Sequence, residues 1–169
     1  LGVLFCSLFS FAQGGTQSPY SILGAGELSY RGFMQHKAMG STSISVTSQN
    51  SFTPTNPASY ANLRFTVYDV GMSVKSGTYT TAEAETPLST GNFDYFAMAF
   101  PFNTKKKMAV SFGTNQYSDV GYSIRNTVST DTPSYENIYT GDGGLNRVYA
   151  GYGIELLPNL NLGVNANFT

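Results

Sequence analysis

Hydrophobic and polar residues alternate with a period of two from about residue 63 to residue 169. Large aliphatic and aromatic side chains occupy one parity, and Gly, Ser, Asn and Ala with a few charges occupy the other. Near the end of the chain, for example, Leu162 and Val164 alternate with Gly163 and Asn165. This alternation predicts β-strands whose two faces meet different surroundings.

The alternation divides into five expected strands, at about residues 63–75, 92–102, 108–125 and 145–156 and in the closing segment 157–169, where the strand follows the turn at residues 158–159. The parity of the apolar residues reverses near Val67, which predicts a bulge or a change of environment there. The third segment is interrupted by the polar residues TNQYSD. We interpret it as one long strand, with two shorter strands as the alternative.

The expected connections alternate in length. Residues 76–90 and 129–144 form long polar loops in this interpretation, whereas residues 103–107 and 158–159 form short turns. Outer-membrane β-barrels combine short periplasmic turns with longer external loops, and their strands place apolar residues toward lipid and polar residues toward the lumen. A soluble exported β-sandwich also alternates, but its outer face usually carries many more charges.

These patterns predict an all-β protein, the N-terminal part of an antiparallel transmembrane β-barrel. About five strands cannot close around a lumen, because the smallest such barrels use about eight. We therefore expect residues 63–169 to be the first strands of a larger barrel. Residues 13–62 are rich in Gly, Pro, Ser and Asn, which predicts irregular structure and short strands rather than helix. We interpret them as a hatch or plug segment.

Composition and the N-terminus agree with export to the outer membrane of a Gram-negative bacterium. Only 11% of the residues are charged while 41% are hydrophobic, against about 25% charged in soluble domains. Residues 1–12 are apolar and end in Ser10-Phe11-Ala12, which predicts the remnant of a signal peptide. A buried hydrophobic helix or strand is the alternative. The single cysteine, Cys6, lies inside this leader.

Catalytic, cofactor, metal and nucleic-acid functions find no support in the sequence. The net charge is −1 without a basic stripe, so nucleic acid is not an expected partner. His36 is the only histidine and lacks the neighbours that a metal site or a Ser/His/Asp set requires. We therefore expect no enzyme activity and no cofactor.

Six residues of the polar parity are candidates for a lumen-facing position. The expected positions are Asp69, Tyr95, Arg125, Arg147, Tyr149 and Glu155. We interpret the four charged members as a structural salt-bridge network in preference to a substrate contact, and the two tyrosines as the lining of a ligand path.

A hatch motif completes the set of candidate residues. Gly40 is followed by Asn56, Pro57 and Ala58 directly before the first expected strand. This arrangement resembles the N-terminal region of the FadL-type outer-membrane transporters of long-chain fatty acids and hydrocarbons. The resemblance implies a closed barrel with an N-terminal hatch in its lumen, through which hydrophobic substrates pass.

The leading functional hypothesis is therefore an outer-membrane barrel that passes hydrophobic, fatty-acid-like small molecules. Its partners would be outer-membrane lipid and the hydrophobic ligand. The alternative hypothesis is a non-transporting barrel subunit or carrier of an outer-membrane secretion or assembly complex, which binds an envelope protein through its loops.

Overall fold

The computed structural model describes residues 16, 18–29, 32–80, 85–128 and 135–169. The proposed signal-peptide remnant at residues 1–12, including Cys6, lies outside these residues. The elements, in chain order, are η1 (Pro19–Ile22), β1 (Glu27–Leu28), α1 (Met34–Ala38), η2 (Pro57–Asn62), β2 (Val67–Thr80), β3 (Glu85–Asn103), β4 (Met108–Val128), β5 (Tyr135–Leu157) and β6 (Leu160–Phe168). The division of the chain at residues 12 and 62 stays a prediction.

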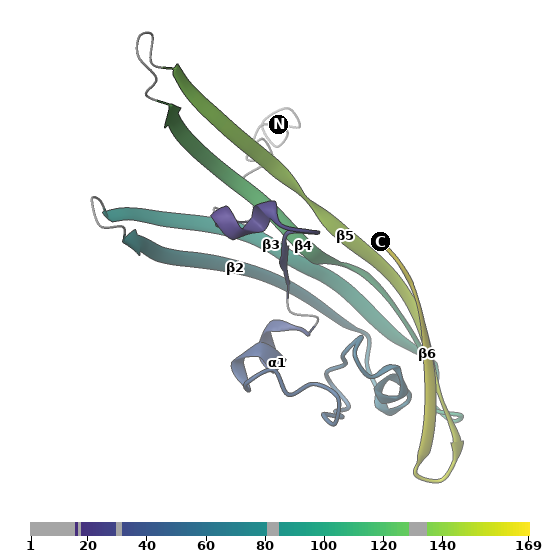
Figure 1. The fold of residues 1–169 in the computed structure, drawn as a ribbon. Helices are drawn as coiled ribbons and strands as arrows, with labels where there is room; N and C mark the ends of the chain where they lie inside the picture. Colours follow the sequence, from purple (N-terminus) through teal and green to yellow (C-terminus); the bar gives the residue numbers. More distant parts are fainter. Residues whose placement is uncertain (1–15, 17, 30–31, 81–84, 129–134) are drawn as a thin grey trace, which may run out of the picture. The chain divides into compact units, whose positions relative to one another are not determined.

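The strands form one six-stranded sheet in the order β2-β3-β4-β5-β6, and the short strand β1 pairs with β4 off this path (Figure 1). The pairs β3/β4 and β5/β6 are antiparallel. The prediction of a mostly β, antiparallel fold is confirmed. The sheet is open, because β2 and β6 are not paired with each other in the described part of the chain; a closed barrel is not observed.

The strands are longer than the sequence pattern predicted, and the prediction of two long loops was wrong. β2 continues to Thr80, β3 begins at Glu85 and β5 begins at Tyr135. Only residues 81–84 and 129–134 separate the strands there, so the expected alternation of loop lengths is lost. The added segments are rich in Thr and Tyr, which favour strands. Their two faces are both largely polar, and the hydrophobic alternation therefore fades although the backbone remains extended.

Two local expectations about the strands have different outcomes. Residues 108–125 lie in the single strand β4, as we predicted in preference to two strands. Of the two interpretations of the parity reversal near Val67, the bulge was wrong, because β2 begins at Val67. Before it, Leu63 is buried and Phe65 is exposed. The parity reversal thus marks the start of a strand.

The expectation for residues 13–62 was partly wrong: the short strand β1 and irregular stretches occur, but helices occur as well. This region contains the short helices η1, α1 and η2. Both 3₁₀ helices begin with a proline, Pro19 and Pro57, whose fixed φ suits the first turn of a helix. In the described residues no helix is both long and apolar enough to cross a membrane.

The chain divides into two compact units. Unit 1 contains Leu1–Glu27, Ser73–Asn92 and Asp119–Gly144, and unit 2 contains Leu28–Met72, Phe93–Ser118 and Leu145–Thr169. We refer to the described residues between 16 and 63 as the N-terminal segment. In unit 2 one face of the sheet, the covered face, packs against residues 32–63 of this segment. Its buried core consists of Phe33, Phe52, Tyr60, Leu63, Tyr95, Ala97, Ala99, Ala109 and Tyr149.

Small residues on the covered face let the N-terminal segment approach the strands. Ala97 pairs with Gly113, and Ala99 pairs with Ser111 across β3 and β4. The opposite parity forms the exposed face of unit 2, with large apolar side chains open to the surroundings: Phe96, Phe102, Phe112, Val148, Leu162, Val164 and Phe168. The period of two in the sequence therefore corresponds to one face under the N-terminal segment and one bare apolar face.

Candidate functional site

The beginning of α1 is fixed to β2 and β3 by Tyr95. The Phe33 ring stacks on the Tyr95 ring with centroids 4.5 Å apart. The backbone N–H of Met34 donates a hydrogen bond to the Tyr95 hydroxyl at 2.8 Å, and that hydroxyl donates to Asp69 Oδ1 at 3.0 Å. A Cβ at Gly71 would collide with the Tyr95 ring. The glycine thus creates the space in which Tyr95 lies flat and holds α1.

A second anchor is formed by η2, which lies in a glycine slot on β5 and β6. The slot consists of Gly151, Gly153 and Gly163, and the last two are cross-strand partners. A Cβ built on Gly163 would lie 2.5 Å from the carbonyl oxygen of Pro57, and one on Gly153 would lie 2.7 Å from the same oxygen. Since the blocking atom belongs to the backbone, only glycine allows η2 to lie this close.

Asn165 closes the slot from β6. The Tyr60 hydroxyl donates to Asn165 Oδ1 at 3.2 Å, and Asn165 Nδ2 donates to the carbonyl of Pro54 at 2.6 Å. The Tyr60 side chain is fully buried, and this burial raises the pKa of Tyr60 to about 12. Its phenol therefore remains neutral at physiological pH. The amide of Asn165 thus joins two points of the N-terminal segment to the sheet.

A buried polar pair lies between β4 and β5. The hydroxyls of Ser111 and Tyr149 are 3.1 Å apart, and both side chains are almost fully buried. Each hydroxyl satisfies the other, which removes the cost of burying either alone. The hydrogen bond joins β4 to β5 on the covered face.

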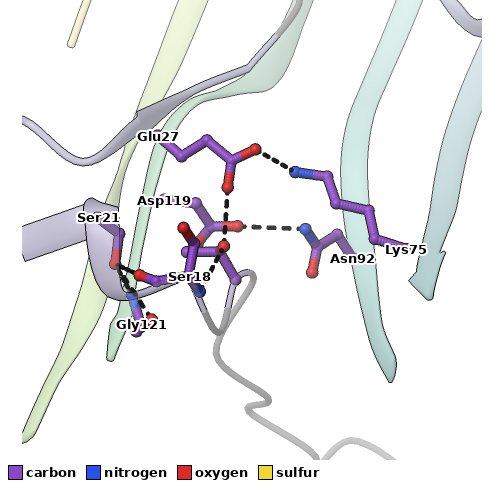
Figure 2. Close-up of polar contacts among 8 residues, drawn as sticks. Ser18, Ser21, Glu27, Lys75, Asn92, Asp119 and Gly121 are labelled. Atoms are coloured by element: carbon purple, nitrogen blue, oxygen red, sulfur yellow. Dashed lines mark hydrogen bonds and ion pairs between the residues drawn. The ribbon is translucent and has the colours of Figure 1, made fainter. Parts of the chain in front are cut away.

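Unit 1 contains a separate polar cluster, shown in Figure 2. Glu27 accepts a hydrogen bond from the Thr16 hydroxyl at 2.8 Å and pairs with Lys75 at 3.2 Å. The Thr16 hydrogen bond, and then Lys75, hold the pKa of Glu27 below its usual value against the opposing effect of burial. The contacts join the N-terminal segment to β2.

The same unit holds further polar contacts (Figure 2). Asn92 donates to Asp119 at 3.2 Å, which joins β3 to β4. Ser21 Oγ donates to the Ser18 carbonyl at 2.7 Å and accepts from the backbone N–H of Gly121 at 3.1 Å. A strand N–H that binds a side chain of η1 holds this helix against β4.

The hatch-motif residues have structural roles in unit 2. Gly40 has φ of 70°, which a glycine adopts without strain. Asn56 Nδ2 donates to the carbonyl of Ile44 at 2.7 Å, and the Asn56 carbonyl accepts from Ser59 Oγ at 2.7 Å. Pro57 and Ala58 are the residues that face Gly163 in the glycine slot. The motif therefore shapes and seats η2.

The predicted lumen-facing residues lie in different places. Tyr95, Asp69 and Tyr149 belong to the covered face described above, whereas Arg125 is exposed in unit 1. Arg147 lies over the Tyr117 ring, 4.3 Å from its centroid. That all six line a lumen stays a prediction.

Three of the four charged candidates form contacts with residues outside this set. Asp69 accepts from Tyr95, Arg147 Nε donates to Thr169 at 3.3 Å, and Glu155 pairs with Lys107 at 2.6 Å. The residues that sequence reasoning missed are the aromatic anchors Phe33, Phe52 and Tyr60. Large aromatic residues isolated in a turn-rich segment were the available signal.

His36 is the remaining candidate for chemistry. It is buried in α1, and its Nδ1 has no hydrogen-bond partner in the described part of the chain. Burial lowers the pKa of His36, although the charge of Asp69 partly offsets this effect. Within the described residues no group of three or more metal-ligating side chains occurs. The buried position of His36 is consistent with a role of α1 in packing the N-terminal segment onto the sheet.

The family model of BamG matches residues 1–169. The chain belongs to the BamG family. No match was found among curated proteins or among solved structures. BamG is a component of the β-barrel assembly machinery, so membership points to the Gram-negative outer membrane and envelope, and to the proteins of that machinery as partners.

BamG membership overturns the FadL-type resemblance and the hypothesis of fatty acid transport. A porin-like role falls with them. The resemblance rested on the short motif at Asn56, Pro57 and Ala58, and its contacts explain it without any ligand: it seats η2 in the glycine slot. A motif that serves packing carries no information about cargo. A component of an assembly complex also fits the expectation of a non-enzymatic protein.

Proposed function

We propose that this chain belongs to an outer-membrane β-barrel subunit of the β-barrel assembly machinery. Its proposed role is structural and partner-binding. The observation that carries the proposal is the BamG match over residues 1–169. It favours the assembly-complex hypothesis that the sequence left as the alternative. The proposed partners are other proteins of the machinery, and the proposed surroundings are outer-membrane lipid.

The exposed face of unit 2 supports a position in lipid. Val148, Leu162 and Val164 are 55%, 51% and 64% exposed, and they occupy one face of adjacent paired strands. Contiguous apolar surface of this kind marks a membrane or protein contact. Detergent dependence separates this proposal from a soluble β-sandwich, which would remain in solution without detergent.

The lengths of the strands support a surface beyond the membrane. β4 has 21 residues and β5 has 23, whereas about 9–11 residues suffice for a strand to cross the hydrocarbon. Such strands extend past the lipid, and the projecting parts offer protein surface to a partner. The proposal thus assigns lipid contact and partner contact to different parts of the same strands.

The N-terminal segment supports a structural role. It is held on the covered face by buried aromatic contacts and by close backbone approach in the glycine slot. A segment that moved aside for cargo would break the Phe33–Tyr95 stack and the Tyr60–Asn165 hydrogen bond together. The contacts therefore favour a fixed element over a gate.

Depletion of the full-length protein tests the proposal. Newly made outer-membrane barrels should accumulate in the unfolded form, seen as loss of heat-modifiable migration in gels, and wild-type protein supplied in trans should restore folding. Normal folding of all outer-membrane barrels after complete depletion would contradict the proposal.

A further inference from the structure

A basic cleft lies in unit 2 at the end of the sheet that carries the β3–β4 turn. Its volume is about 670 Å³, within the range of clefts that bind ligands. Its lining includes Thr47, Ser48, Gln49, Arg64, Phe65 and Lys107. The backbone N–H of Arg64 donates to the Gln49 carbonyl at 3.2 Å, which fixes two of its walls together.

The two charged side chains that line the cleft are both cationic. Arg64 and Lys107 line it, and no Asp or Glu is among its described lining residues. Lys105 and Lys106 adjoin Lys107 in the same turn and are exposed. Glu155 contacts this group through Lys107. Four of the nine Lys and Arg residues in the chain thus meet at one end of one unit.

The turn that presents these lysines is held in place before any partner arrives. The backbone N–H of Lys106 donates to Asn103 Oδ1 at 3.0 Å. The carbonyl of Lys107 accepts from the backbone N–H of Glu155 at 3.3 Å, and Lys107 has φ of 45°. A cationic surface with a fixed backbone loses less conformational entropy on binding than a mobile one.

We propose that the basic cleft binds an acidic, extended peptide segment of another subunit of the β-barrel assembly machinery. The inference rests on the proposed function, which supplies a protein partner. Lys107 already pairs with Glu155. Arg64, Lys105 and Lys106 match carboxylates of a partner, and arginine binds a carboxylate through two parallel hydrogen bonds. The hydroxyl and amide side chains of Thr47, Ser48 and Gln49 offer hydrogen bonds to a peptide backbone.

Phe65 favours a peptide over an anionic lipid headgroup. Its side chain is 63% exposed at the cleft, and aromatic residues and arginine are the side chains enriched in protein interfaces. A phosphate headgroup would use the cations alone, whereas a peptide also uses the polar wall and the aromatic ring. The same cleft therefore offers charge, hydrogen bonds and apolar contact within one volume.

Site-specific photo-cross-linking in native membranes tests the proposal. A photoreactive amino acid at Thr104, which is exposed and lines the cleft, should yield an adduct with a subunit of the machinery. The charge reversals Arg64→Glu and Lys106→Glu should lower the adduct yield about tenfold or more, because each removes a charge-assisted hydrogen bond and adds repulsion. Lys37→Glu is the matched control at an exposed lysine of α1 and should leave the yield unchanged.

A purified-component measurement separates peptide from lipid. The full-length protein in detergent should bind a fluorescent glutamate-rich peptide, lose it at high salt, and ignore a lysine-rich peptide of equal length. Phosphatidylglycerol vesicles should compete no better than phosphatidylcholine vesicles. A lipid adduct alone at Thr104, or peptide binding unchanged by Arg64→Glu and Lys106→Glu, would overturn the proposal.

The outcomes also distinguish this proposal from the proposed function. If wild-type protein co-purifies with the machinery and both charge reversals bind as well as wild type, only the basic cleft is wrong. If wild-type protein does not co-purify with the machinery, the proposed function fails and the inference fails with it.

Discussion

Replacing Gly163 with valine should force η2 out of the glycine slot. A Cβ at this position would lie 2.5 Å from the Pro57 carbonyl oxygen, and a backbone atom has no rotamer by which to escape. Overpacking of this kind costs about 1–3 kcal/mol, equivalent to about a 5- to 150-fold change in the ratio of seated to released η2. Release would also break the hydrogen bond between Tyr60 and Asn165.

Hydrogen–deuterium exchange of the full-length protein measures this effect. The backbone N–H groups of Ser59 and Leu63, which bond to Asn56 and Tyr60 within η2, should exchange faster in Gly163→Val. Gly77→Val is the matched control, because a Cβ at this β2 glycine meets nothing within 4 Å. Equal protection of η2 in wild type and Gly163→Val would refute the account of the glycine slot.

Three other changes test the anchors of the N-terminal segment. Tyr60→Phe should lower the free energy of unfolding by about 1–3 kcal/mol, because it leaves Asn165 Oδ1 without its donor. Since the folded pKa of Tyr60 is raised, its contribution in thermal unfolding should be full below pH 10 and lost as the pH rises through about 12. Phe33→Ala should cost about 3–5 kcal/mol and speed proteolysis of the segment, whereas Ile44→Ala, at a residue 71% exposed, should change little. Glu27 has a lowered folded pKa, so its contribution to the free energy of unfolding should be full above pH 4.5 and lost as the pH falls through the folded value. Proteolysis rates of wild type and Glu27→Gln should therefore differ at neutral pH and converge at low pH, and a difference that persists at every pH would contradict this.

The two-faced strands could be predicted from the sequence because burial follows the period of two. Leu162 and Val164 proved exposed and Tyr95 proved buried, in keeping with the parity of their segments. The extensions of β2, β3 and β5 could not be predicted in the same way. There the side chains on both faces are largely polar, and hydrophobic alternation carries no signal even where the backbone is paired.

The contacts of the N-terminal segment lay beyond sequence reasoning for a different reason. Phe33 stacks on a residue 62 positions later, and Tyr60 bonds to a residue 105 positions later. Local propensity says nothing about such distant partners. Glycines at Gly153 and Gly163 looked like ordinary small residues of a polar parity, and only the position of η2 shows why a side chain is excluded there.

The functional hypothesis failed where it relied on a short motif. Asn56, Pro57 and Ala58 shape a turn and seat it on glycines, and this requirement belongs to packing rather than to transport. The BamG match extends over residues 1–169, so it rests on the strands and the N-terminal segment together.

Co-purification from native membranes tests the central claim most directly. Tagged full-length protein, extracted in mild detergent and resolved by native electrophoresis and mass spectrometry, should migrate with the other proteins of the β-barrel assembly machinery in fixed stoichiometry. Migration as a free protein, with those other proteins recovered together without it, would contradict the claim.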